Sequence, residues 1–187
     1  MNEHITRYDR MPIPPVEAQT LWIDAGAVRI GVEYRLLTDA IAAVNEVIAA
    51  AGATQEAAAV TSPVPLDDRG VSLHVFGVGA GATAQEYLRF DCFDEDPHYH
   101  YISWRDMSNE MIHLDAIADG DPLAWALERI RTRLPQMLAR AGAADVAARV
   151  DPAAIERALP RVAEAAYRAR YHHDAGAVMR SALGSAA

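Results

Sequence analysis

Hydrophobic and polar positions alternate over an early stretch of the chain, residues 28–36. Apolar side chains occupy every second position there, and polar or small residues fall between them. Because successive side chains of a strand point to opposite faces, this pattern predicts a strand with one buried face. Apolar residues then recur at helical spacing over residues 41–51, with Thr38 as the expected N-cap and Gly52 as the expected stop.

Four further strands are predicted after a loop that spans residues 53–70. The predicted ranges are residues 71–78, 86–93, 98–104 and 110–116. Their connections are short and rich in turn residues, which favours consecutive antiparallel pairing. The first connection, residues 77–83, is rich in glycine, but a strand and not a helix follows it. We therefore expect a hairpin loop there and not a dinucleotide-binding loop.

Two helices are predicted in the last third of the chain. Asp121-Pro122 and Asp151-Pro152 each combine an N-cap residue with proline at the first helical position. Since an internal proline removes a backbone donor, Pro135 is expected to kink or end the first helix. For the same reason Pro160 is expected to interrupt the second helix, or to open a new helix that runs to about residue 171.

These elements define an α+β fold class. We expect an antiparallel sheet of about five strands in the order β-α-β-β-β-β, followed by C-terminal helices packed on the sheet. Residues 1–24, which include three prolines at positions 12, 14 and 15, are expected to form an N-terminal arm over the domain or over a partner subunit. A chain of 187 residues fits one domain, so residues 25–187 are assigned to a single α+β domain.

Composition and charge narrow the functional classes. The net charge of −9 argues against nucleic-acid binding, because such binding depends on basic side chains. The chain contains no lysine, which excludes a Schiff-base lysine and a P-loop lysine, and this absence is typical of a GC-rich bacterial genome. Its single cysteine, Cys92, excludes an internal disulfide and a multi-cysteine zinc site. No apolar run is long enough to span a membrane and the first residues do not resemble a signal peptide, so a cytoplasmic location is expected.

The hairpin of residues 87–104 carries most of the reactive side chains. If the turn is Asp94-Glu95-Asp96-Pro97, Phe93 faces His98 and Asp91 faces His100 across the two strands. The apolar face of this hairpin, which we expect in the core, carries Leu88, Phe90, Cys92, Tyr99 and Tyr101. The opposite face carries Arg89, Asp91, Phe93, His98 and His100. If the loop has three or five residues, the register shifts by one residue and the side chains of one strand change faces.

The polar face of the hairpin suggests a catalytic or metal site. Asp91 and His100 form a carboxylate–imidazole pair that could serve as a general base, with Arg89 and His98 as ligand-binding neighbours. His98 and His100 lie two positions apart on one strand, which suits two ligands of one zinc or iron ion. A third ligand could come from His74 on the preceding strand or from His113 on the following one.

Three functions remain open at this point. A purely structural role of the hairpin is also open, because cross-strand Asp–His pairs and aromatic hairpins commonly stabilise sheets. Cys92 is expected to be a buried core thiol and not a nucleophile. The first hypothesis is a non-catalytic binding or accessory protein that self-associates through the sheet and the arm. The second is a small metal-dependent enzyme, and the third is a protein that holds a small apolar ligand between sheet and helices.

Overall fold

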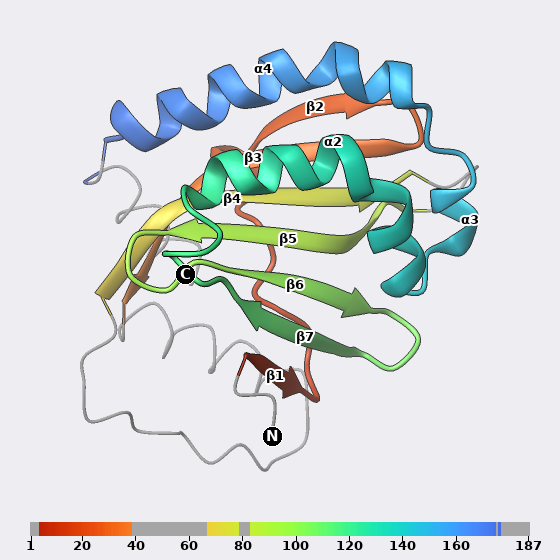
Figure 1. Ribbon diagram of the computed structural model, residues 1–187, viewed down its shortest axis with the longest axis horizontal. Coiled ribbons are helices and arrows are strands. Elements are labelled where there is room, and N and C mark those ends of the chain that lie inside the picture. Colours follow the sequence, from red (N-terminus) through yellow and green to blue (C-terminus); the bar gives the residue numbers. More distant parts are fainter. Residues whose placement is uncertain (1–3, 39–66, 79–82, 175, 177–187) are drawn as a thin grey trace.

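The computed structural model describes residues 4–38, 67–78, 83–174 and 176. In this part of the chain, seven strands form one antiparallel sheet in the order β1-β7-β6-β5-β4-β3-β2 (Figure 1). The strands are β1 (Ile5–Tyr8), β2 (Leu21–Ala25), β3 (Val28–Thr38), β4 (Asp67–Gly77), β5 (Gln85–Phe93), β6 (His98–Ser103) and β7 (Ser108–His113).

The helices follow the sheet in sequence, apart from a short 3-10 helix, η1 (Glu17–Gln19), before β2. They are α2 (Pro122–Arg140), α3 (Ala144–Ala147) and α4 (Pro152–Tyr171). Figure 1 shows α2 and α4 lying side by side over one face of the sheet. The expected α+β class, with helices packed on an antiparallel sheet, is therefore confirmed.

Both predicted helix starts are confirmed by their caps. The Asp121 carboxylate accepts a hydrogen bond from the backbone nitrogen of Ala124 at 2.8 Å, and Asp151 accepts one from Ala153 at 2.9 Å. The expectations that the helices end or begin at these prolines are wrong, because α2 continues through Pro135 and α4 through Pro160 to Tyr171. Buried side chains on both sides of each proline hold the two segments on the sheet, which offsets the lost backbone hydrogen bond.

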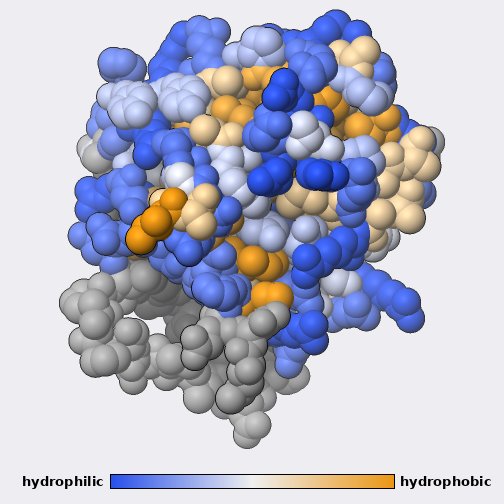
Figure 2. Space-filling model, viewed as in Figure 1, coloured by the Kyte–Doolittle hydropathy of each residue, from blue (hydrophilic) through white to orange (hydrophobic). Residues whose placement is uncertain are grey.

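The hydrophobic core fills the layer between the sheet and these two helices. The alternating apolar residues of β3 are all buried, as their period predicts: Val28, Ile30, Val32, Tyr34 and Leu36. They meet a stripe of buried helix residues that includes Leu123, Ile130, Leu134, Leu138, Ile155 and Val162. Each such side chain contributes about 1.5–3 kcal/mol by leaving water. On the outer side of the helices, Figure 2 shows a mainly hydrophilic surface with small apolar areas between charged side chains.

The sheet is larger than the sequence predicts, and its order differs. β1 lies within the expected arm of residues 1–24 and β2 begins in it and ends at Ala25, and β1 pairs with β7 at one edge while β2 pairs with β3 at the other. Neither strand shows a clear period of two over enough residues to be recognised. Residues 67–70, predicted as loop, belong to β4, and Thr38, expected as an N-cap, ends β3.

Other expectations fall partly outside the described residues. The predicted helix over residues 41–51 and residues 53–66 of the predicted loop lie outside the described residues. β4 and β5 follow each other in the chain and pair antiparallel, so the predicted hairpin is confirmed. Residues 79–82 of its connection lie outside the described residues. Within the described ranges, no helix has the length and apolar character needed to cross a membrane.

Candidate metal centre

The face of the sheet that carries no helices is lined with polar side chains, and they are buried. On β3, β4, β5, β6 and β7 these residues are Glu33, Ser72, His74, Arg89, Asp91, His98, His100 and Asn109. Strand alternation places them opposite the apolar core. Because burying polar groups without partners costs several kcal/mol, each of them needs a hydrogen bond or an ion pair.

The hairpin register differs from the expected one by two residues. Asp91 pairs with His98 and Arg89 pairs with His100, whereas the sequence suggested Phe93 opposite His98. The turn is wider because the Asp68 carboxylate accepts hydrogen bonds from the backbone nitrogens of residues 95 and 96, at 3.0 and 2.9 Å. A shift of two leaves every side chain on its predicted face. Leu88, Phe90, Cys92 and Tyr101 are accordingly in the core, and Tyr99 packs against it.

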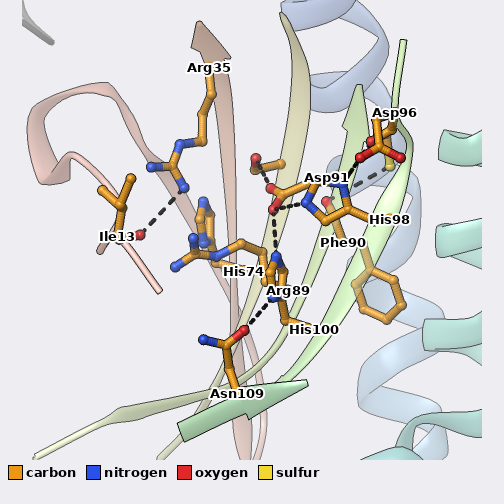
Figure 3. Close-up of polar contacts among 12 residues, drawn as sticks. Ile13, Arg35, His74, Arg89, Phe90, Asp91, Asp96, His98, His100 and Asn109 are labelled. Atoms are coloured by element: carbon orange, nitrogen blue, oxygen red, sulfur yellow. Dashed lines mark hydrogen bonds and ion pairs between the residues drawn. The ribbon is translucent and has the colours of Figure 1, made fainter. Parts of the chain in front are cut away.

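Three predicted site residues, Asp91, His98 and His100, converge and are called the His–Asp cluster below. Asp91 Oδ2 lies 3.3 Å from His98 Nε2 and 3.2 Å from His100 Nε2 (Figure 3). One potential ligand atom from each residue lies within 4.8 Å of the others. The three residues are only 4%, 7% and 7% exposed, respectively. The other carboxylate oxygen, Asp91 Oδ1, accepts a short hydrogen bond from the Ser72 hydroxyl.

Hydrogen bonds on the far side of each ring define the histidine tautomers. His98 Nδ1 lies 2.7 Å from the backbone oxygen of Asp96, which can only accept, so Nδ1 carries a proton. His100 Nδ1 lies 2.9 Å from Asn109 Oδ1, and Asn109 Nδ2 donates to the backbone oxygen of Arg10 at 2.7 Å. That second bond orients the amide so that its oxygen faces the ring. In the neutral form of either histidine, the Nε2 that faces Asp91 therefore carries a lone pair.

Burial and mutual contacts shift the three pKa values in different directions. Burial favours the neutral form of Asp91, but the contacts of its carboxylate with His100 and His98 outweigh burial and hold the pKa of Asp91 well below its usual range. Burial lowers the pKa of His100 despite its contact with Asp91. For His98, the hydrogen bond and charge of Asp91 overcome burial and raise the pKa. A proton in this cluster is therefore held preferentially between His98 and Asp91.

His74 belongs to a second cluster on the same face, with Glu33, Glu86 and Arg89. Its Nδ1 lies 2.7 Å from Glu86 Oε1 and its Nε2 lies 3.1 Å from Glu33 Oε2. Arg89 binds Glu86 through two hydrogen bonds of 2.9 and 2.7 Å. Burial alone would raise the pKa of Glu86, but the charge of Arg89 and the hydrogen bond from His74 lower it to about 2. The ring nitrogens of His74 and the guanidinium of Arg89 are thus directed at glutamates, away from the expected metal and ligand roles.

The structure also keeps His113 outside the His–Asp cluster. It pairs with His98 across β6 and β7, and the two ring centroids are 6.0 Å apart. However, its Nδ1 lies 2.7 Å from the side chain of Asp96, at the outer end of the hairpin turn. His113 is therefore a neighbour of the residue that supports His98, and not a third histidine of the cluster.

Several supporting residues were not found from the sequence. Ser72 and Asn109 occupy polar positions in predicted strands or at their edge, so strand alternation could have placed Ser72 on the correct face. Glu86 reaches the same face through a register shift between Val75 and Phe76, which the sequence does not reveal. Glu33 was visible as an alternating polar position of β3, but its partner His74 depends on the pairing of β3 with β4.

The fold and the site define a class: an antiparallel α+β domain with helices on one face and a buried His–Asp cluster on the other. The family described as "Domain of unknown function (DUF7700)" matches residues 22–166, and the chain belongs to this family. The matched range includes the whole His–Asp cluster and Asn109, and it begins after the proline-rich segment. No curated protein and no solved structure matches the chain.

Proposed function

We propose that this protein is a small metal-dependent enzyme whose His–Asp cluster binds one divalent transition-metal ion of the zinc or iron type. The proposal rests on the arrangement of three potential ligand atoms, His98 Nε2, His100 Nε2 and Asp91 Oδ2, which face one another. Both Nε2 atoms face the same oxygen of Asp91, while both Nδ1 atoms are held by acceptors behind the rings. With both rings neutral, three lone pairs face one another, and only a cation or a shared proton between them removes the repulsion.

The donor set supports a transition metal. Two imidazole nitrogens and one carboxylate are typical ligands of zinc and of non-haem iron, whereas magnesium and calcium prefer oxygen ligands. Each ligand also has a supporting partner: the backbone oxygen of Asp96 for His98, the amide of Asn109 for His100, and the hydroxyl of Ser72 for Asp91. Such outer partners orient metal ligands and are a regular part of metal sites.

The number of ligands favours a catalytic site over a structural one. Structural zinc sites use four protein ligands, while three protein ligands leave a position for water or substrate. A metal ion held here would supply Lewis acidity or, in the case of iron, redox chemistry. Burial lowers the pKa of His100 and the histidine contacts lower that of Asp91, so both would be held in the forms that bind a metal, whereas the raised pKa of His98 means that a metal ion would displace a proton from this ring.

Metal binding can be tested directly with a matched histidine control. Metal-free protein would be titrated with Zn²⁺, and with Fe²⁺ under anaerobic conditions, by calorimetry and elemental analysis. We expect one equivalent in the wild-type protein and in His113→Ala, and a loss of about 100-fold or more in affinity in His98→Ala, His100→Ala and Asp91→Asn. Absence of binding by the wild-type protein, or equal binding by all variants, would show that the cluster only stabilises the sheet.

A groove between α4 and the β2–β3 edge supports a second candidate, the binding of a small amphipathic anion. The groove has a volume of about 610 Å³, within the usual range for ligand pockets. Its lining includes the apolar residues Leu21, Ile23, Val32, Tyr34, Ala165 and Ala169. Its polar lining includes Gln19, whose buried Nε2 has no hydrogen-bond partner among the described residues, and Arg161, for which they provide no ion pair. Arg168 and Glu164, which also line the groove, form an ion pair with each other. Hydrogen-bond donors beside apolar side chains suit a ligand that has an apolar body and an anionic group.

Binding of an anionic aromatic probe tests this second candidate. We expect anilinonaphthalene sulfonate to bind the native protein at one site and to lose that site in Ala169→Trp, which fills the groove. A native protein that leaves the probe fluorescence unchanged would contradict this function. The same measurement on Ala163→Trp, which lies on α4 outside the lining of the groove, serves as the control.

We also propose that the protein self-associates through the edge strand β2. β2 is an edge strand with unpaired backbone groups, and its Leu21 is 54% exposed. Such edges readily pair with another chain. Light scattering at micromolar concentration should therefore give a mass above that of the monomer, and a strictly monomeric protein would exclude this proposal.

A further inference from the structure

The segment between β1 and β2 crosses the polar face of the sheet. β1 is paired with β7 at one edge and β2 with β3 at the other, with β6, β5 and β4 between them. The connecting residues 9–16, called the arm below, therefore pass from one side of the sheet to the other. Figure 1 shows the arm running along the sheet on the side away from α2 and α4.

Hydrogen bonds to polar-face side chains attach the arm at both ends. At the β7 end, Asn109 Nδ2 donates to the backbone oxygen of Arg10 at 2.7 Å. At the β3 end, the backbone nitrogen of Val16 donates to Glu33 at 3.2 Å, and Arg35 donates to the backbone oxygen of Ile13 at 3.5 Å (Figure 3). The prolines of the arm have no amide hydrogen, so the arm cannot join a strand ladder. In the part of the chain that the structure describes, these three hydrogen bonds hold the arm over a face whose His–Asp cluster is almost fully buried.

Asn109 connects the arm to the His–Asp cluster through a single amide group. Its Oδ1 accepts from His100 Nδ1 at 2.9 Å, while its Nδ2 binds the arm. The docked arm therefore selects the amide orientation that keeps the proton on His100 Nδ1 and the lone pair on Nε2. When the arm leaves, this constraint on the amide is lost, and the support of His100 is weakened.

We propose that the arm is a lid over the metal site and that Asn109 is the positioning residue that couples lid closure to the geometry of His100. The inference rests on the proposed metal-binding function. Since coupling between two events is reciprocal, a bound metal ion stabilises the closed arm, and the closed arm slows release of the metal. The buried cluster exchanges metal and reaches substrate only when the arm opens.

Two sets of variants separate the roles of the arm and of Asn109. Asn109→Asp keeps an acceptor for His100 but loses the donor to the arm, so we expect release of Zn²⁺ to a chelator to be at least about fivefold faster than in the wild-type protein. Asn109→Leu loses both bonds and should weaken affinity by about tenfold or more. Pro12→Gly/Pro14→Gly leaves all cluster residues intact and increases the freedom of the open arm, so release should be about tenfold faster.

Proteolysis reports arm opening independently of metal release. Trypsin cleavage after Arg10, followed by mass spectrometry, requires local opening of the arm. Zn²⁺ should slow this cleavage in the wild-type protein and slow it much less in Asn109→Asp. If the wild-type protein takes up no metal, both the proposed function and this inference fail. If it takes up metal but release and cleavage rates match in all variants, the lid alone is overturned.

Discussion

Arg89 holds Glu86 through two parallel hydrogen bonds inside the polar face of the sheet, Nε to Oε1 at 2.9 Å and Nη2 to Oε2 at 2.7 Å. Both side chains are almost fully buried. Removing one partner of such a pair leaves an uncompensated charge in the interior, which is far more costly than losing a surface ion pair.

Glu86→Gln is expected to lower the free energy of unfolding by about 3–5 kcal/mol, because Arg89 would remain buried and charged. Urea denaturation measures the change. The double variant Glu86→Gln/Arg89→Met should recover much of the loss, and Glu128→Gln, which removes an exposed partner of Arg131, should cost less than about 1 kcal/mol. A loss below about 1 kcal/mol for Glu86→Gln would contradict the ion pair.

The lowered pKa of Glu86 predicts that the folded protein loses stability in acid. The pKa of Glu86 is lowered from an ordinary 4.5 to about 2, so the unfolded chain binds its proton more readily than the folded one. The stabilisation from this group is complete above pH 4.5 and disappears as the pH falls toward 2, a loss of about 3 kcal/mol. Urea unfolding at several pH values across this window should show a steeper loss in the wild-type protein than in Glu86→Gln, and equal slopes in the two proteins would refute this prediction.

The start of α2 and the end of α4 are joined by Asp121 and Arg170, whose Oδ2 and Nη1 atoms are 2.6 Å apart. Since Asp121 is also a helix cap, Asp121→Ala should cost about 2 kcal/mol, of which about 1 belongs to the cap. Asp151→Ala removes a cap with only a 3.6 Å exposed contact to Arg157, so it should cost about 1 kcal/mol. Thermal denaturation of both variants gives the comparison, and equal losses would argue against the contribution of Arg170.

Gly70 of β4 lies against the backbone of β5. A Cβ atom at this position would overlap the carbonyl oxygen of Cys92 and lie 2.7 Å from the Cα of Phe93. Backbone atoms cannot rotate away, so Gly70→Ala should destabilise the protein by about 2 kcal/mol or more. In Gly31→Ala the new methyl group would meet side-chain atoms of Thr20 and Trp22, which can move, and a smaller loss is expected. Denaturant midpoints of the two variants would test this difference.

Cys92 should be unreactive in the folded protein. It is buried in the core, and burial raises the pKa of its thiol far above the usual range, so almost no thiolate is available. A thiol reagent should label it only as fast as the protein unfolds, with immediate labelling in urea. Rapid labelling under native conditions would show that the hairpin opens on its core side.

The parts of the fold that depend on local signals were predictable from the sequence. The period of two in β3 and the Asp-Pro starts of α2 and α4 are properties of short segments, and the structure confirms them. The face assignment of the hairpin also follows from alternation alone, so it is correct although the pairing is offset by two residues. The continuation of α2 and α4 through proline could not be predicted, because tertiary packing decides it.

The partners of the candidate site depend on which strands are neighbours, and local patterns do not carry that information. His74 and His100 both lie opposite Arg89, on either side of β5, yet His74 is bound by glutamates and only His100 meets Asp91. The burial of this polar face also could not be inferred from the sequence. A polar face of an antiparallel sheet ordinarily indicates solvent contact, and here a segment from the beginning of the chain crosses it.

The pairing of β1 with β7 has a consequence for how the chain folds. Ile5 lies opposite Ile112, so β1 can pair only after a partner about a hundred residues later in the chain has been synthesised. Contacts of such long sequence separation form late and slowly. The remaining strands and helices can assemble before this edge is complete, and the His–Asp cluster would then stay open to water and metal ions until the N-terminal strand docks.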